Sequence, residues 1–334
     1  MYKVLIVGAT TVNSADISLS LKKAFEKQNC EARLISANED FPFLIDFVYH
    51  AAGKKVNDKV RSLFSRYVFD KAKTWNPDVV FLNGSNVFVS ATTIKDLQNK
   101  LGCKVVLWEL NNRCFVGYQA EAISLYDHIF SLDSYLLPVL RVSGAKNVHT
   151  LFACADPQEY SLENLDATQV AKFKSDISFI GSAYPERAEI LRQLADYDLR
   201  IYGKSWKRYP ELASRVSDQF IMDITKLKIF SNSRISINIQ GAHMINGENF
   251  RVFEAAACGG VSFSTYKPDL AQCFKPDSEI IIFDDARDLR EKADYYLAHL
   301  AELQAIGQAA RRRLLAEHTY DHRVKTILKY LQLN

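Results

Sequence analysis

The sequence has little cysteine, and none of it is spaced as a metal-binding pair. Six cysteines are scattered through 334 residues, and no two of them are separated by only two residues. Structural zinc sites usually show CxxC pairs or clusters of cysteine and histidine. We therefore expect the cysteines to be small buried side chains in a reducing compartment rather than metal ligands.

The sequence also lacks a long apolar run. No stretch approaches the roughly 18 uninterrupted apolar residues that a membrane-spanning helix needs. The first residues, MYKVLIVG, are typical of a buried strand and not of a cleavable export signal. We expect a cytoplasmic protein.

A strong net charge is absent as well. The chain has 42 basic and 39 acidic residues, a formal net charge of +3. Proteins that bind nucleic acid usually carry a marked basic excess, so no nucleic-acid partner is expected.

One segment departs from this balance. Lys54–Lys73 contains seven basic and two acidic residues, and an apolar stripe at helical spacing comprises Val60, Leu63, Phe64, Tyr67 and Val68. A basic amphipathic helix of this kind either covers a sheet or lies on the inner face of an anionic membrane, where lipid-linked acceptors reside. General frequencies favour the covering helix.

The first strand-like run ends in glycine, but the sequence lacks the rest of a dinucleotide-binding fingerprint. After Gly8, the positions that G-x-G-x-x-G would fill with glycine are Thr10 and Asn13. Those glycines allow the backbone to approach a pyrophosphate closely. NAD binding is therefore not expected here, and Gly8 either ends a strand or forms one wall of an acceptor site.

Short apolar runs do alternate with helical segments along the whole chain. Runs such as Lys3–Gly8, Lys104–Leu110 and Ile177–Ile180 are typical of buried parallel strands. The alternation predicts parallel sheets with helices on both faces. The expected fold class is α/β, with two Rossmann-like doubly wound lobes facing a cleft.

A polar stretch divides the two series of strands. We expect a first, acceptor-binding lobe over residues 1–155, a linker over 156–175, a nucleotide-sugar-binding lobe over 176–317 and a last helix over 318–334 that packs back on the first lobe. Ligand crevices in such lobes lie at the carboxyl ends of the strands. The cleft between the lobes is therefore the expected site.

Two segments of the second lobe carry the chemistry of a phosphate site. In ISFIGSAYPER, Gly181 and Ser182 stand at a strand end just before a helix, where free N–H groups attract phosphate oxygens. Arg187 in the first turn either reaches the same anion or lies on a solvated helix face. In NGENFRVFEAAACGG, Arg251 and Glu254 share a helix face. Arg251 suits a phosphate and Glu254 the hydroxyls of a ribose, unless the two form an internal ion pair.

The second lobe resembles the glycosyltransferase group 1 families, and specifically the spore maturation protein CgeB-like branch. The matching stretches follow in order from about residue 176 to 323: ISFIGSAYPERAEIL, LRIYGKSW, SRISINIQ, NFRVFEAAACGGVSFST, EIIIFDDARDLREKADYYLAHL and EHTYDHR. Looser matches in the first lobe are VVFLNGS, VVLWELNN, YDHIFSLDS and LFACADPQEY. The resemblance implies the GT-B fold, a nucleoside-diphosphate-sugar donor and no required metal or other cofactor.

The resemblance also assigns donor-side residues. Glu254 matches the second glutamate of the E-x7-E signature, which holds the ribose, whereas the position of the first glutamate is Asn246, with Glu248 close by. The loop with Gly181 and Arg187 matches the diphosphate loop. The expected donor-binding residues are Gly181, Ser182, Gly203, Lys204, Asn246, Gly247, Glu248, Asn249 and Glu254.

Catalysis is expected to depend on charge stabilisation. Arg187 and Arg251 would stabilise the departing diphosphate, and Glu109, at the end of a strand, would contact the acceptor or act as a base. The expected acceptor-side residues are Gly8, Asn13, Asn83 and Ser85. The resemblance favours retention of the anomeric configuration, in which the leaving phosphate takes the proton. The acceptor is expected to be a glycan, a lipid-linked sugar or a protein.

Two alternatives remain open. A sugar-nucleotide epimerase on the same fold would need carboxylates and a histidine around the sugar, and His50, His128 and His149 do not form an evident set. A non-catalytic nucleotide-sugar-binding or spore-coat-type protein would keep only the fold. Asn246, in place of the first signature glutamate, keeps this second alternative open.

Overall fold

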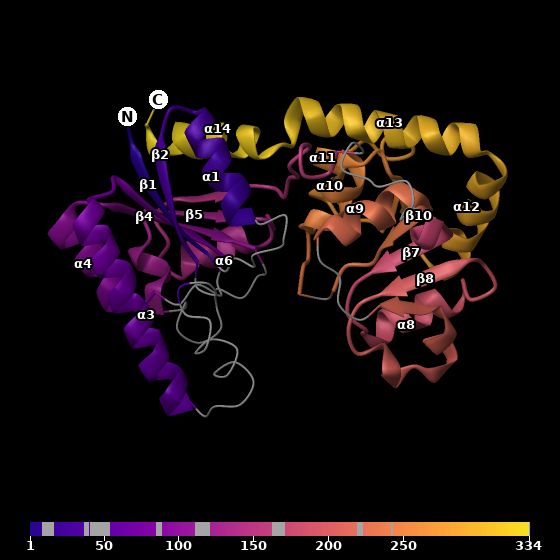
Figure 1. The fold of residues 1–334 in the computed structure, drawn as a ribbon, viewed down its shortest axis with the longest axis horizontal. Coiled ribbons are helices and arrows are strands. Elements are labelled where there is room, and N and C mark those ends of the chain that lie inside the picture. The colour runs from indigo at the N-terminus through magenta and orange to yellow at the C-terminus, as the bar shows by residue number, and fades with distance from the viewer. Residues whose placement is uncertain are drawn as a thin grey trace. The chain divides into compact units, whose positions relative to one another are not determined.

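The chain folds into two compact units, each around its own parallel sheet. The computed structural model describes residues 1–8, 17–36, 40, 54–84, 89–110, 121–161, 171–218, 223–241 and 243–333. The first unit comprises Met1–Phe152 and Tyr320–Asn334, and the second comprises Ala153–Thr319 (Figure 1).

The sheet of the first unit has six parallel strands in the order β2-β1-β3-β4-β5-β6. The strands are β1 (Lys3–Gly8), β2 (Glu31–Ser36), β3 (Val79–Asn83), β4 (Lys104–Glu109), β5 (His128–Ser131) and β6 (Val148–Thr150). The central strands β1, β3 and β4 are buried along almost their whole length. This is why their sequences are continuous apolar runs without polar alternation.

Helices cover the strands of this sheet. They are α1 (Ile17–Lys27), α3 (Lys54–Trp75), α4 (Ala91–Leu101), α6 (Leu136–Val142) and α14 (Tyr320–Leu331), with a short 3-10 helix η1 (Ile123–Leu125). Helix α14, yellow in Figure 1, lies beside α1. It is held to the strand region where Arg323 Nε donates to the carbonyl oxygen of Phe152 at 2.7 Å and Lys104 Nζ donates to that of Leu331 at 2.7 Å.

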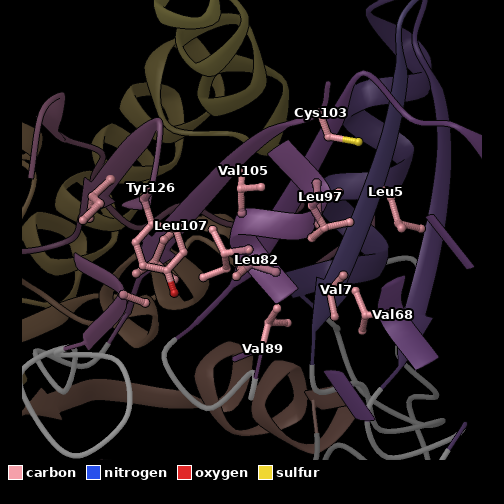
Figure 2. Close-up of a cluster of buried hydrophobic side chains, with 14 of the residues drawn as sticks. Leu5, Val7, Val68, Leu82, Val89, Leu97, Cys103, Val105, Leu107 and Tyr126 are labelled. Carbon is pink, nitrogen blue, oxygen red and sulfur yellow. The ribbon is translucent and has the colours of Figure 1, made fainter. Parts of the chain in front are cut away.

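The basic segment of the first unit forms helix α3, whose apolar stripe packs inward. Phe64, Val68 and Ala72 belong to the buried core of the unit, and Figure 2 shows Val68 together with Leu97 of α4 beside the strand residues. Leu63 is 47% exposed. The structure therefore favours the interpretation of α3 as a helix that covers the sheet.

The sheet of the second unit also has six parallel strands, in the order β12-β11-β10-β7-β8-β9. The strands are β7 (Ser175–Ile180), β8 (Leu199–Tyr202), β9 (Val216–Asp218), β10 (Ser233–Asn238), β11 (Ser262–Thr265) and β12 (Ile281–Phe283). The helices are α8 (Pro185–Arg192), α9 (Asp223–Asn232), α10 (Phe250–Ala257), α11 (Leu270–Cys273), α12 (Ala286–Ala298) and α13 (Leu300–Glu317). Short 3-10 helices are η3 (Ala171–Phe173), η4 (Trp206–Arg208) and η5 (Pro210–Arg215).

Each sheet has a point at which the strand order reverses. In the first unit this point lies between β1 and β3, and in the second it lies between β7 and β10. In open α/β sheets, the loops that leave neighbouring strands at such a point diverge to opposite faces and leave a crevice at the carboxyl ends. The two doubly wound sheets confirm the expected fold class, and their topology indicates where a ligand crevice is expected.

Two predictions, on membrane-spanning helices and on the cysteines, can be compared directly with the structure. Within the described part of the chain, no helix combines the length and the apolar character needed to cross a bilayer. The five described cysteines are buried, as expected for small core side chains.

Candidate functional site

The candidate donor site lies in the second unit, at the carboxyl ends of β7 and β10. The loop after β7 begins at Gly181 and leads into α8, and the segment after β10 leads to Asn249, the N-cap of α10. These loops leave the sheet at its reversal point, so their residues meet at one edge. Most of the sequence-predicted donor residues lie on these two loops.

Backbone hydrogen bonds join the loop after β7 to the loop after β8. Gly181 N donates to the carbonyl oxygen of Tyr202 at 2.8 Å, and Ala183 N donates to that of Lys204 at 3.0 Å. Gly203 has φ +144°, and a Cβ there would lie 2.1 Å from the Gly181 oxygen. The expectation of a free Gly181 N–H is therefore wrong, because strand pairing continues one residue beyond β7 and uses this donor. Ser182 is half-buried beside it, and the Lys204 side chain is exposed.

Arg187 is a buried cation that ties two loops together. Only 4% of its surface is exposed. Its Nε donates to the Ile239 carbonyl oxygen at 3.0 Å and its Nη1 to that of Ser182 at 2.9 Å. The guanidinium carbon lies 4.8 Å from the ring centroid of Tyr184. The alternative of a solvated helix face is wrong for Arg187, which bridges the ends of β7 and β10.

Arg187 and Arg251, which we call the arginine pair, place two like charges in one partly dehydrated region. Burial and the charge of Arg251 lower the pKa of Arg187 to about 10. Burial also lowers the pKa of Arg251, although Glu248 and Glu254 oppose this shift. The structure records no ion pair between a carboxylate and either arginine within the described residues. The pair therefore leaves a local positive charge that a bound anion would offset.

Glu254 lies on α10 one turn after Arg251. It is 7% exposed, and its Oε1 accepts from Lys226 Nζ of α9 at 2.8 Å. Its Oε2 is buried and has no hydrogen-bond partner. The internal Arg251–Glu254 pair that the spacing allowed does not form, because Glu254 turns to Lys226. A buried oxygen without a donor is costly, and a ligand hydroxyl would satisfy it.

Glu248 is a buried carboxylate of this region, with 3% exposure. Its Oε1 accepts from Asn238 Nδ2 at 3.0 Å, from Asn249 N at 2.7 Å and from Gln240 Nε2. Its Oε2 lies 3.4 Å from Ser264 Oγ. Burial raises the pKa of Glu248 to about 7 against the opposing effect of these hydrogen bonds and of nearby Arg251.

The segment before α10 is anchored to the next loop of the sheet. Asp269 N donates to the carbonyl oxygen of Asn246 at 3.1 Å. Lys267 Nζ donates to the carbonyl oxygens of Met244 and Ile245 at 2.8 and 3.1 Å. Gly247 follows in the same anchored turn. These contacts fix the approach to α10, so Asn246 contributes its backbone to the loop.

In the first unit, Gly8 and Asn83 face each other at the reversal point between β1 and β3. Asn83 is buried, and its Nδ2 donates to Ser18 Oγ of α1 at 2.9 Å. A Cβ on Gly8 would lie 2.1 Å from the same Oγ, so glycine permits the close approach of α1. The Asn83 Oδ1 atom is buried and has no hydrogen-bond partner. Asn13 and Ser85, the other two expected acceptor residues, lie outside the described residues.

Glu109 ends β4, two strands from Gly8 in the same sheet. Its side chain has no exposed surface. A catalytic base must come within hydrogen-bond distance of the acceptor, so full burial weighs against direct contact by Glu109.

Sequence reasoning missed the polar partners of the two glutamates. Asn238, the last residue of the buried strand β10, and Gln240, just after it, bind Glu248, and Lys226 on α9 binds Glu254. Polar residues at the end of an otherwise apolar strand are a usable signal, because that end borders the ligand crevice. The Lys226 pairing has no comparable signal, since it joins residues 28 positions apart.

Comparisons with known proteins agree with this geometry. Residues 187–329 match the model of a family described as glycosyl transferase-like. Spore protein CgeB of Bacillus subtilis strain 168 is 23% identical over 238 residues, covering 65% of this chain and 72% of that protein. Both confirm the resemblance found in the sequence.

Solved structures show the same fold over the whole chain. Sucrose-phosphate synthase of Thermosynechococcus elongatus has a TM-score of 0.70 at 13% identity, covering 100% of this chain and 99% of that one. HepE of Anabaena in complex with UDP-glucose has a TM-score of 0.70 at 10% identity, covering 99% and 100%. A glycosyltransferase of Rickettsia africae ESF-5 has a TM-score of 0.67 at 13% identity, covering 98% and 97%. The shared fold is GT-B.

The second unit thus combines a glycosyl transferase-like sequence with a parallel sheet whose reversal point carries two arginines and a buried glutamate. The first unit supplies the other Rossmann-like sheet of the GT-B fold. Residues 187–329 therefore have a glycosyl transferase-like sequence, and the chain as a whole has the GT-B fold.

Proposed function

We propose that the second unit binds a nucleoside-diphosphate-sugar and that the sugar is transferred, without a metal ion and with retention of configuration, to an acceptor held by the first unit. The acceptor is a glycan, a lipid-linked sugar or a protein. The arginine pair is the observation that carries the proposal. Two guanidinium groups that form no ion pair with a carboxylate among the described residues, at the reversal point of a parallel sheet, suit the two phosphates of such a donor.

The arginine pair would act mainly on the leaving group. Cleavage of the glycosidic bond leaves negative charge on the diphosphate, and preorganised cations stabilise that charge in a dehydrated site. This is the contribution that a divalent cation makes in metal-dependent enzymes. Ser182 and the exposed Lys204 border the same loops and would complete the phosphate contacts, whereas Gly181 shapes the loop through its backbone hydrogen bonds.

Glu254 would bind the ribose. Its Oε2 is buried, lacks a hydrogen-bond partner and accepts readily from a hydroxyl group, while Lys226 holds Oε1. Carboxylates bind ribose hydroxyls in many nucleotide sites. Replacement by alanine removes both the acceptor and the charge that Lys226 requires.

In the first unit, Asn83 would contact the acceptor. Its Nδ2 is committed to Ser18, so Oδ1 would accept from a hydroxyl group of the acceptor. In a retaining reaction the leaving phosphate takes the acceptor proton, which removes the need for an exposed carboxylate base and agrees with the burial of Glu109.

Binding of sugar nucleotides tests the donor proposal. HepE, which shares the fold, was crystallised with UDP-glucose, so UDP-glucose is the first ligand in a panel with GDP-, dTDP-, ADP- and CMP-sugars. We expect one ligand to raise the thermal midpoint of the wild type by mass action, and the Glu254→Ala and Arg251→Ala variants to respond weakly. The surface variant Arg290→Ala is the control and should respond as the wild type does.

Product analysis separates transfer from the alternatives. A transferase releases the free nucleoside diphosphate faster when an acceptor is present, whereas an epimerase converts the sugar and releases none. A non-catalytic binding protein gives neither product. A panel in which no sugar nucleotide binds would overturn the donor proposal.

A further inference from the structure

The carboxyl group of Glu248 joins three elements of the donor site without an exposed surface of its own. Its four donors come from the end of β10 (Asn238 and Gln240), from β11 (Ser264) and from the N-terminus of α10 (Asn249). A side chain with so many internal partners has little capacity left for a ligand. Its position between strand ends and helix indicates a role in holding them.

The network around Glu248 extends directly to the turn that carries Arg251. Asn249 caps α10, and its Oδ1 accepts from Arg251 N at 2.8 Å. The Nδ2 of the same residue donates to Asn238 Oδ1 at 2.8 Å. Since Glu248 Oε1 binds both Asn238 and the Asn249 backbone, it fixes the first turn of α10 relative to the strand ends.

The charge of Glu248 also acts on the first turn of α10, which carries Arg251. The charged groups that face its carboxyl are Arg251 of α10 and Lys267 after β11. An ionised Glu248 attracts Arg251 and repels a diphosphate, whereas a protonated Glu248 leaves the charge of the arginine pair uncompensated. Burial raises the pKa of Glu248 to about 7, so the two states exchange near neutral pH.

We propose that Glu248 is a proton-dependent positioning residue of the donor site, which holds the first turn of α10 in place and, when protonated, strengthens diphosphate binding by the arginine pair. This inference rests on the proposed donor function of the same site. It replaces the sequence-based expectation that Glu248 itself binds the donor.

The test measures the dissociation constant of UDP-glucose by calorimetry between pH 5.5 and 8.5. The diphosphate of UDP-glucose has no terminal phosphate, and therefore lacks the second ionisation near pH 6 that a phosphomonoester shows. The pH dependence then reports on the protein. We expect the wild-type dissociation constant to rise about tenfold from pH 6 to pH 8, the change that one unit of coupling between the two charges produces.

Two substitutions separate proton binding from positioning. Glu248→Gln keeps an oxygen at the Oε1 position for Asn238 and Asn249 and removes the ionisation, so its dissociation constant should stay near the low-pH value throughout. Glu248→Ala removes the acceptor and should weaken binding at every pH. Glu211→Gln, an exposed carboxylate paired with Arg192, is the control and should keep the wild-type profile.

The outcomes are distinguishable. Binding by the wild type that does not depend on pH, or a Glu248→Gln profile that follows the wild type, overturns this inference and leaves the donor proposal intact. Equal loss of binding in Glu248→Gln and Glu248→Ala also overturns it, because a direct ligand role would require the carboxylate itself. No binding of UDP-glucose or of any other sugar nucleotide by the wild type overturns the inference and the donor proposal together.

Discussion

Gly203 is a position where a single methyl group should damage the candidate donor site strongly. Its φ of +144° lies in a region that side chains avoid, and a Cβ there would lie 2.1 Å from the Gly181 oxygen and 2.6 Å from its carbonyl carbon. Both atoms belong to backbone that is hydrogen-bonded, because Trp206 Nε1 donates to the same oxygen at 2.9 Å. The loops after β7 and β8 must therefore separate when alanine replaces Gly203.

The size of the effect follows from two contributions. A strained backbone conformation costs about 1–3 kcal/mol, and steric overpacking costs about 1–3 kcal/mol more. We expect Gly203→Ala to lower the free energy of unfolding of the second unit by about 2–6 kcal/mol. For a unit of this size each kcal/mol lowers the thermal midpoint by roughly 2–4 °C, which calorimetry of the whole chain resolves.

Gly259→Ala is the matched control for this experiment. Gly259 lies in the same unit and also has a positive φ of +74°, but the nearest atom to an added Cβ is Arg311 Cδ at 4.0 Å. Alanine there should cost only the left-handed conformation, about 1–2 kcal/mol. If Gly203→Ala proves no more destabilising than Gly259→Ala, the argument that the two loops need backbone contact is refuted.

Three further predictions concern titration and packing. The Glu248 carboxyl has a pKa of about 7 in the folded protein and about 4.5 in the unfolded chain. The free energy of unfolding that Glu248 contributes should therefore fall by about 3 kcal/mol as pH rises from 4.5 to 7. The difference in this pH dependence between the wild type and Glu248→Gln, measured by unfolding curves, checks the prediction. Burial lowers the pKa of His149 to about 4 from 6.5, so stability should rise with pH in that interval and His149→Phe should remove the rise. Phe64→Ala should cost about 3–5 kcal/mol and the half-exposed Leu63→Ala less than about 1, as measured by urea unfolding; equal costs would contradict the packing of α3.

The sequence predicted the two sheets well because buried parallel strands need continuous apolar runs. Runs such as Lys3–Gly8 and Ile177–Ile180 became β1 and β7 almost without change of boundary. The short edge strand β9 escaped prediction. Its residues, VSD, have no apolar run, and β9 pairs with only one neighbour, β8.

The sequence indicated where the proposed donor residues meet but not which contacts they make. Glycines and charged residues at strand ends pointed to one edge of the second sheet, and topology alone brings those strand ends together. The partners were not predictable, because Lys226 with Glu254 and Asn238 with Glu248 come from separate elements. No local pattern encodes such pairs.

Arg187 shows how burial decides between two interpretations of a residue. From spacing alone, an arginine in the first turn of a helix either reaches a ligand or faces water. In the structure its Nε and Nη1 bind two carbonyl oxygens that come from opposite sides of the reversal point. A cation that must hold β7 and β10 together also brings its charge to the crevice that those strands define. The bridging of the two strand ends and the proposed phosphate binding thus both favour an arginine at position 187, and a lysine, which lacks a rigid planar fork, would not meet both requirements.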